Sequence, residues 1–300
     1  MNYKAFEEFC KNNKIEYCKN EPMKHHTSFK IGGNADFLVK VASLNELKAV
    51  LKEIVKLNIS YFILGKGSNL LVSDKGIEGV VISLLEMNEI LVSEDTITAL
   101  AGASLAAVCN AALENCLEGL EFAYGIPGSV GGALYMNAGA YGGEMSQVVT
   151  KAEYITPDGK TASIALKDMH LGYRTSIFKN TDKIITCVTF KLKKGKEAEI
   201  KAKMNDFITR RRSKQPLEYP SAGSTFKRPE GYFAGALIEE NNLKGKAVGG
   251  AMVSQKHAGF VINYNNACCS DVMELIDYIK KTVLENNGVQ LECEVIFVGR

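Results

Sequence analysis

The sequence lacks several features that mark particular classes of protein. It has no tryptophan, only six prolines and four histidines, and neither an H-E-x-x-H nor a C-x-x-C motif. No apolar run approaches the ~20 residues that a membrane helix needs, so we expect no membrane span. The first residues carry acidic side chains and lack a basic start followed by an apolar block, which is not the pattern of a secretion signal. We therefore expect a cytoplasmic protein.

The sequence also contains no pattern that indicates disulfide bonds or a metal site. The eight cysteines are scattered through the chain. Without a secretion signal we expect them to be reduced, buried thiols. The histidines include an adjacent pair, His25 and His26, but no set of ligands at zinc-binding spacing. The sequence therefore predicts no metal site.

The charges are close to balanced. Lysine and arginine number 36 and aspartate and glutamate 34, for a net charge of +2. With no basic stripe set apart, this balance does not indicate binding to nucleic acid. Hydrophobic residues make up 46% of the 300 positions, which is ample for a packed core and favours more than one domain.

Apolar periodicity predicts a mixture of strands and helices, which is an α+β pattern. Ser43 and Glu46 form a capping-box pattern that begins a helix. Its apolar face is expected to contain Leu44, Leu47, Val50, Leu51, Ile54 and Val55. Further helices are expected from Ser104 to near Gly119, at 196–213, and at 271–286, where Gly288 ends the last one. Strands are expected at 35–41, 61–64, 70–73, 79–84, 97–102, 151–155, 160–164, 184–192, 247–254, 259–264 and 291–299.

The first glycine-rich motif lies between two expected strands. Its residues are Gly65, Lys66, Gly67, Ser68 and Asn69, followed by Leu70. Glycines allow a tight turn in which several backbone N–H groups face an anion, and lysine adds positive charge. A strand follows, whereas a Rossmann fingerprint opens a helix, and no Gly-Lys-Ser/Thr completes a P-loop. Phosphate binding and a plain hairpin turn are equally consistent with the motif taken alone.

A second glycine-rich stretch spans residues 125–144. So many glycines cost conformational entropy on folding, which favours a compensating role such as close approach of the backbone to a flat or phosphorylated ligand. A close-packed turn region is the alternative. The candidate ligand-binding residues here are Gly125, Ile126, Pro127, Gly128, Ser129, Gly132, Asn137, Gly139 and Ala140.

Three further segments carry reactive side chains. Ser224 lies in a glycine-containing turn that is not the G-x-S-x-G of an esterase, so taken alone a structural serine is favoured. Arg174 is either a carboxylate-binding cation or an ordinary surface residue. Glu292 and Glu294 alternate along the last strand and lie on one face, which a solvent-facing edge explains equally well. The basic run 210–214 either complements a helix C-terminus or meets a diphosphate.

Taken together and in order, these segments resemble the UDP-N-acetylenolpyruvoylglucosamine reductases of bacterial cell-wall synthesis. The resemblance spans nearly the whole chain. It rests on HTSFKIGGNADFLV, ILGKGSNLLVSDKGIEGVVI, GLEFAYGIPGSVGGALYMNAGAYGGE, YRTSIFK, RRRSKQP, SAGSTFKRP, AGALIE and LECEVIFVG. Longer members carry an insertion whose tyrosine folds over bound substrate. This chain has no room for it after Tyr173 and therefore resembles the shorter branch.

The resemblance implies a fold, three domains and a reaction. The fold is the vanillyl-alcohol-oxidase type, with FAD-binding subdomains at 1–85 and 86–205 and a substrate-binding α+β domain at 206–300. NADPH reduces non-covalently bound FAD and leaves. UDP-N-acetylglucosamine enolpyruvate then takes a hydride from the flavin and a proton from the protein, giving UDP-N-acetylmuramate. No other partner is implied, and a monomer is plausible.

The resemblance also assigns roles to individual residues. Ser224 is similar to the family's proton donor, and Arg174 is similar to the cation that balances negative charge on the substrate carboxylate and the developing enolate. Glu294 is similar to the carboxylate that orients or polarises this enolate. Lys214 and Tyr173 match substrate-contacting positions. The loop 65–70 is implied to hold the FAD pyrophosphate, and the stretch 125–141 to line the flavin. Arg228 has no assigned role.

Three alternatives stay open. The first is a flavin oxidase of the same superfamily, with FAD attached covalently, for which His25 and Cys109 are candidates. The second is a non-catalytic module that binds flavin or nucleotide sugar. The third is a Rossmann-type dehydrogenase, which the strand after the first glycine loop disfavours.

Overall fold

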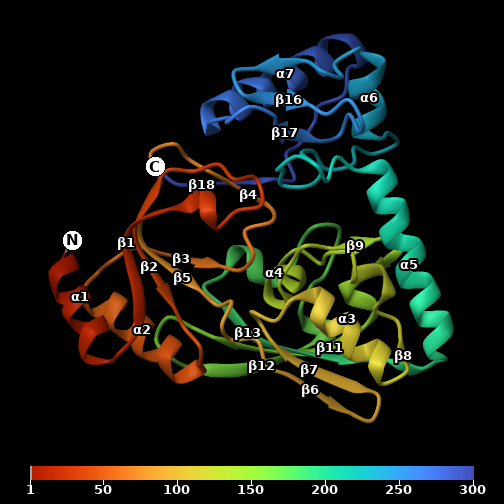
Figure 1. The fold of residues 1–300 in the computed structure, drawn as a ribbon. Helices are drawn as coiled ribbons and strands as arrows, with labels where there is room; N and C mark the ends of the chain where they lie inside the picture. The colour runs from red at the N-terminus through yellow and green to blue at the C-terminus, as the bar shows by residue number, and fades with distance from the viewer. Residues whose placement is uncertain (1) are drawn as a thin grey trace. The chain divides into compact units, whose positions relative to one another are not determined.

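A computed structural model describes residues 2–300, and the chain divides into two compact units (Figure 1). The first unit contains residues 1–18, 37–66 and 79–210, and the second contains residues 19–36, 67–78 and 211–300. The chain therefore passes between the units several times. One passage, between Lys66 and Gly67, falls inside the first glycine-rich motif.

The first unit contains both helices and strands, as the apolar patterns predict. The helices are α1 (Tyr3–Asn12), α2 (Leu44–Lys56), α3 (Leu105–Glu114) and α4 (Val130–Tyr135). The strands are β3 (Tyr61–Leu64), β6 (Ile90–Ser93), β7 (Thr96–Leu100), β8 (Leu117–Glu118), β9 (Gly139–Ala140), β10 (Gly143–Glu144), β11 (Val149–Ile155), β12 (Thr161–Ala165), β13 (Ile184–Lys191) and β14 (Lys193–Lys194). Four elements contain a passage between the units: β1 (Glu16–Pro22), β2 (Asn34–Lys40), β5 (Ile77–Ser83) and α5 (Glu197–Lys214).

Two sheets organise these strands. One has the order β1-β2-β5-β3, and its β3 and β5 are parallel, with Tyr61 opposite Val80. The other is antiparallel, with the order β12-β11-β13-β7-β6. Helices α3 and α4 lie against one face of this second sheet (Figure 1).

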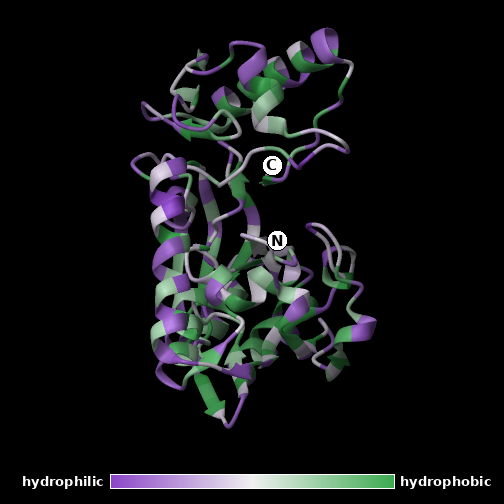
Figure 2. Ribbon diagram, turned by 90° about the vertical axis from the view of Figure 1, so that its right-hand side faces the viewer, coloured by the Kyte–Doolittle hydropathy of each residue, from purple (hydrophilic) through white to green (hydrophobic). Residues whose placement is uncertain are grey.

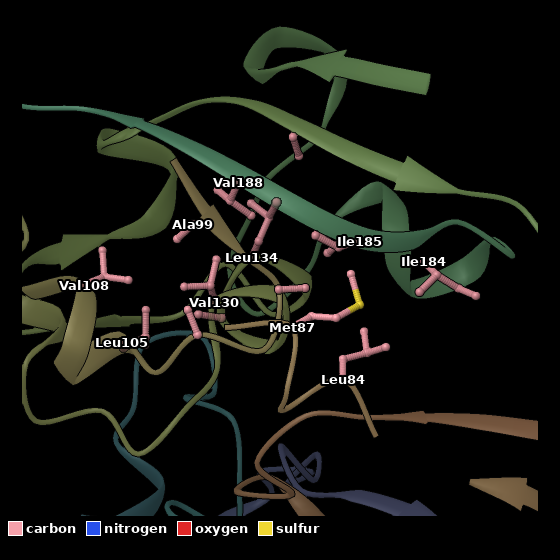
Figure 3. Close-up of a cluster of buried hydrophobic side chains, with 14 of the residues drawn as sticks. Leu84, Met87, Ala99, Leu105, Val108, Val130, Leu134, Ile184, Ile185 and Val188 are labelled. Carbon is pink, nitrogen blue, oxygen red and sulfur yellow. The ribbon is translucent and has the colours of Figure 1, made fainter. Parts of the chain in front are cut away.

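The core of the first unit lies between those helices and the antiparallel sheet. Figure 3 shows Leu105 and Val108 of α3 and Val130 of α4 directed toward Ala99 and Val188 of the sheet, and all five are buried. Alternation along β7 and β13 directs every second side chain to this face. The site segments that precede and follow α4 are thereby fixed to a rigid base.

The second unit is smaller and has its own core. Its strands are β4 (Leu70–Val72), β15 (Ala247–Val248), β16 (Ala251–Val253), β17 (Val261–Asn263) and β18 (Ile296–Val298), and its helices are α6 (Ala234–Glu240) and α7 (Cys269–Asn287). Strands β15, β16 and β17 form an antiparallel sheet, and β18 pairs in parallel with β4. The buried face of α7, which includes Val272, Leu275 and Ile279, packs into this core.

Local capping signals from the sequence are confirmed. Ser43 Oγ accepts the backbone N–H of Glu46 at 3.2 Å, which is the first arm of the expected capping box. The Glu46 carboxylate accepts the N–H of Ala42 at 2.8 Å rather than that of Ser43, so the second arm reaches one residue further back than expected. Ser104 caps α3 in the same way, through the N–H of Ala107. Gly288 ends α7 with φ +68°, the left-handed conformation that glycine adopts without strain.

Several expectations about the elements were wrong. Val55 is 54% exposed because, at 100° per residue, it lies about 90° from the centre of the buried face of α2. Helix α3 ends at Glu114, five residues before Gly119, and β8 follows. Residues 247–254 form two strands joined at Gly249–Gly250 rather than one, because Gly249 has φ +50°. The strand expected at 291–299 is regular only in β18.

The cysteines are all free, but only four of the eight are buried. Cys18, Cys116, Cys268 and Cys293 are partly exposed, which corrects the expectation that all are buried. Among residues 2–300, no helix has the length and apolar character required to cross a bilayer. The long helix α5 is mostly purple or pale in Figure 2, and of its 18 residues only Ile200 and Met204 are buried.

Candidate active site

The loop 65–69 follows β3 and leads into β4, so a strand succeeds it and the Rossmann alternative is excluded for this motif. Gly67 has φ +60°, and a Cβ placed on it would lie 2.1 Å from the carbonyl oxygen of His26 and 3.0 Å from Cα of Thr27. Both the dihedral and the close approach therefore require glycine here. The segment 26–28 packs directly on the loop.

The backbone of this loop is suited to an anion. Within residues 2–300, none of the five N–H groups of residues 65–69 donates a hydrogen bond to another residue. Successive N–H groups without protein acceptors are what a pyrophosphate needs, and polar backbone groups are seldom left without a partner. The Lys66 side chain is exposed and adds a positive charge. The residues present therefore fit a phosphate-bearing cofactor such as FAD.

The two glycine-rich segments meet in the first unit. A Cβ on Gly65 would lie 2.4 Å from Oγ of Ser129, so the loop backbone lies against this side chain. Ser129 is 2% exposed and caps α4, accepting the N–H of Gly132 at 3.4 Å. Two segments predicted to bind one ligand, 60 residues apart in the sequence, are thus neighbours.

The glycines of the second stretch do not share one role. Gly131 packs against Ala101, where a Cβ would approach that side chain to 2.9 Å. Gly139 packs inside the β9–β10 hairpin, where a Cβ would lie 2.7 Å from the carbonyl oxygen of Gly143. Close packing accounts for these two. A Cβ on Gly128 or Gly132 would meet nothing nearer than 3.5 Å or 3.3 Å, but Gly128 is buried and only Gly132 is exposed.

The remaining predicted residues of this stretch support the turn. Gly128 donates its N–H to the carbonyl of Ile126 at 2.8 Å across Pro127. Ile126 donates in turn to Ala123 at 3.0 Å, which places Gly125 in the turn between them. Sequence inspection missed the helix α4, because two glycines stand at its start.

Asn137 connects the second stretch to the turn that carries Arg174. Its Nδ2 donates to the carbonyl of Gly172 at 3.0 Å, and its Oδ1 accepts the N–H of Ser146 at 3.0 Å. Asn137 is 1% exposed, and both its amide nitrogen and its amide oxygen have hydrogen-bond partners, as buried polar groups generally do. This contact fixes the turn onto the segment that follows α4.

Arg174 occupies the tip of that turn. Gly172 and Thr175 exchange backbone hydrogen bonds of 3.1 and 3.2 Å, and Arg174 between them has φ +55°. Its guanidinium lies over the ring of Tyr173, with Cζ 5.3 Å from the ring centroid. Lys179 Nζ donates to the Arg174 carbonyl at 3.2 Å. A non-glycine residue held in the left-handed region is uncommon and marks a constrained position.

Ser224 and Glu294 are brought together in the second unit. The N–H of Glu294 donates to the carbonyl of Thr225, the residue after Ser224, at 2.9 Å. Thr225 is 2% exposed, and its Oγ1 accepts the N–H of Val261 at 2.9 Å. Ser224 itself is exposed, and Gly223 before it has φ +80°. The serine hydroxyl is thus presented from a rigid support.

The loop 67–69 joins the same group of residues. Asn69 Nδ2 donates to the carbonyl of Glu294 at 3.1 Å, and the N–H of Ile296 donates to the Asn69 carbonyl at 2.9 Å. The loop predicted to bind phosphate and the strand that carries Glu294 are therefore held together. Asn69 was predicted only to bind cofactor, and its contact with Glu294 was not foreseen.

Other predicted residues are more exposed. Tyr173 is 54% exposed, and Lys214 is an exposed residue at the end of α5. Leu70 begins β4 and is 9% exposed, Ala140 lies in β9, and Ser68 is partly buried. Arg228 lies over Phe233, with Cζ 4.1 Å from the ring centroid.

The candidates for covalent flavin attachment differ in accessibility. Cys109 is 1% exposed, and its Sγ donates to the carbonyl of Leu120 at 3.3 Å. Burial raises the pKa of Cys109 to about 12, with a further contribution from Glu121, so very little thiolate is present at neutral pH. His25 lies on the surface, at the end of the 3₁₀ turn Met23–His25. Cys109 is therefore a poor nucleophile for flavin attachment.

Comparison with known families matches most of the chain. Residues 35–165 match the family described as FAD binding domain, and residues 215–298 match the one described as UDP-N-acetylenolpyruvoylglucosamine reductase, C-terminal domain. The loop 65–69 and the stretch 125–144 both fall in the first match. Ser224 and Glu294 fall in the second.

Individual relatives cover nearly the whole chain. The chain is 48% identical over 298 residues to a UDP-N-acetylenolpyruvoylglucosamine reductase of Clostridium perfringens strain SM101, covering 99% of this chain and 97% of the relative. A protein of the same name from Syntrophomonas wolfei is 51% identical over 281 residues, covering 93% and 94%. The crystal structure of the Thermus caldophilus reductase superposes with a TM-score of 0.80 at 35% identity, covering 95% of this chain and 98% of that one.

Proposed function

Because the chain belongs to the UDP-N-acetylenolpyruvoylglucosamine reductase family, we propose that it reduces UDP-N-acetylglucosamine enolpyruvate to UDP-N-acetylmuramate, a precursor of peptidoglycan. It is an FAD-dependent oxidoreductase with an α+β FAD-binding fold, and NADPH is the co-substrate. The observation that carries this conclusion is sequence identity near one half over almost the full length of named reductases.

The chain's own residues support the cofactor. The five N–H groups of residues 65–69 offer donors for a pyrophosphate, and Ser129 lies beside Gly65. Gly132 is exposed, so its backbone is accessible to a ligand. Bound FAD supplies the chemistry of hydride acceptance and donation that side chains lack. A pKa of about 12 for Cys109 supports non-covalent binding.

We assign the proton to Ser224. Reduction of the enolpyruvyl double bond adds a hydride to its terminal carbon and a proton to the carbon that bears the carboxylate. A serine hydroxyl is a weak acid, which suits protonation of a strongly basic enolate-like carbon. Ser224 is exposed for contact with a ligand while Thr225 anchors the backbone beside it. The proton it loses must return from water before the next turnover.

Two charged residues complete the proposed set. The Arg174 guanidinium, at the tip of a constrained turn, would stabilise negative charge that accumulates on the substrate carboxylate. Glu294 would orient or polarise the same region, and its backbone is bonded to Thr225 and Asn69. Lys214 and Tyr173 are proposed as substrate contacts. The segment 206–300 is proposed as the substrate-binding domain, and 1–85 and 86–205 as the FAD-binding subdomains.

The experiment that tests this function measures enolpyruvate-dependent oxidation of NADPH by the purified flavoprotein. Ser224→Ala should leave the reduction of FAD by NADPH intact and strongly slow formation of UDP-N-acetylmuramate. Ser163→Ala, a change at an exposed serine of β12, is the matched control and should behave as the wild type. Oxygen uptake with simple alcohols and no turnover of the UDP substrate would instead support a flavin oxidase. We further propose a cytoplasmic monomer.

A further inference from the structure

Ser28 lies where two functional segments of the second unit come together. Its hydroxyl donates to the carbonyl of Ser221 at 2.7 Å, and its backbone N–H donates to the carbonyl of Gly67 at 3.3 Å. The carbonyl of Ser68 is 3.4 Å from the same hydroxyl, which has one proton and gives it to the nearer acceptor, Ser221. One residue thereby bridges the loop 67–69 and the segment that leads to Ser224.

The segment around Ser28 is itself firmly held. Phe29 and Ile31 are 1% and 2% exposed and belong to the core of the second unit. Asn263 Nδ2 donates to the carbonyl of Phe29 at 3.2 Å, and the N–H of Asn263 donates to the carbonyl of Pro220 at 2.8 Å. Asn263 thus holds Phe29 and Pro220, the chain neighbours of Ser28 and Ser221. The Ser28 hydroxyl therefore belongs to a rigid frame.

The segment 221–225 needs such an anchor. Its far end is fixed, because Thr225 donates its N–H to the carbonyl of Gly259 at 2.8 Å. Between the two ends, Gly223 has φ +80° and nothing within 4 Å of a Cβ position, so local packing does not restrain it. The position of the exposed Ser224 depends on how well residue 221 is held.

We propose that Ser28 is a positioning residue for proton transfer. Its hydroxyl holds Ser221, and through Ser221 the Ser224 hydroxyl, at a fixed position relative to the loop 67–69. The inference rests on the proposed role of Ser224. Ser28 does not touch substrate in this mechanism. Removing its hydroxyl leaves the backbone hydrogen bond to Gly67 in place, so FAD should still bind. The Ser224 hydroxyl, however, should no longer be held in its position.

The test separates the two half-reactions of the holoenzyme by rapid mixing without oxygen. In Ser28→Ala, the reduction of FAD by NADPH and the affinity for FAD should stay within about twofold of wild type. Reoxidation of the reduced flavin by UDP-N-acetylglucosamine enolpyruvate should slow roughly tenfold or more, because small misplacement of a reacting group costs rate steeply. The solvent deuterium isotope effect on reoxidation should rise, because proton delivery becomes more limiting.

Four further variants complete the test. Ser28→Thr retains a hydroxyl and should restore reoxidation toward the wild-type rate, and Ser163→Ala should change neither half-reaction. If Ser28→Ala does not fold, Ser28→Cys fills the same space with a weak donor and should show the selective loss instead. Parallel loss in both half-reactions, or wild-type reoxidation in folded Ser28→Ala or Ser28→Cys, would overturn the proposal. Ser224→Ala is measured alongside: if it too reoxidises normally, the assigned proton donor fails rather than Ser28.

Discussion

Substitution of Gly67 by alanine tests the phosphate-binding loop most sharply. At φ +60° an alanine costs about 1–2 kcal/mol relative to glycine. Its Cβ would also lie 2.1 Å from the carbonyl oxygen of His26, so one of the two segments must move. Such overpacking adds roughly 1–3 kcal/mol. The total expected loss in the free energy of unfolding is about 2–5 kcal/mol.

The matched control is Gly159→Ala in the β11–β12 turn. Gly159 has φ +82°, but nothing lies within 4 Å of a Cβ there, so only the dihedral cost of about 1–2 kcal/mol applies. Thermal unfolding of the apoproteins should place Gly67→Ala several degrees below Gly159→Ala, at about 2 °C per kcal/mol. Displacement of the loop N–H groups should also weaken FAD binding at least tenfold, because each charge-assisted hydrogen bond contributes roughly 1.5–3 kcal/mol. Equal melting temperatures and equal FAD affinities for the two variants would refute this reasoning.

Three other outcomes are expected. Asp74 accepts hydrogen bonds from the N–H groups of Cys269 and Ser270, at 2.6 and 2.9 Å, at the start of α7. Asp74→Ala should therefore lower the free energy of unfolding in urea by about 1 kcal/mol. An unchanged urea midpoint would contradict this prediction. Burial lowers the pKa of His257 below its usual value of about 6.5, so the unfolded chain takes up that proton first. Its stabilising contribution is therefore present above about pH 6.5 and is lost as pH falls from there through the lowered pKa of the folded chain. His257→Gln should flatten the dependence of urea stability on pH between 7.5 and 5.5, and an identical slope would argue against this reasoning. Acid denaturation should release all of the flavin, in wild type and in Cys109→Ser alike, and flavin retained on the precipitated chain would indicate covalent attachment.

Much of the fold could be predicted because its signals are local. The helix starts at Ser43 and Ser104 and the left-handed end of α7 at Gly288 each depend on residues within a few positions of one another. The strand after the first glycine loop was also evident from its apolar run. Where local signals conflict, prediction fails. Helix α4 has two glycines in its first turn, which disfavour a helix, yet packing of Val130 and Leu134 on the sheet stabilises it.

The candidate site was predictable in its parts but not in its connections. The glycine spacing of 65–69 indicated an anion-binding turn, and the resemblance singled out Ser224, Arg174 and Glu294. No local pattern indicates that Asn137 holds the turn of Arg174, or that Ser28 bonds to Ser221, 193 positions away. Such hydrogen bonds depend on tertiary packing, and a single hydroxyl carries no periodicity from which they could be inferred.

The most direct test of the proposed function is the anaerobic reaction of the NADPH-reduced holoenzyme with UDP-N-acetylglucosamine enolpyruvate. The flavin absorbance should return fully, with one UDP-N-acetylmuramate formed for each flavin reoxidised and one solvent-derived hydrogen on the carbon beside the carboxylate. Reduced flavin that persists with this substrate and reoxidises only when oxygen is admitted would contradict the function proposed here.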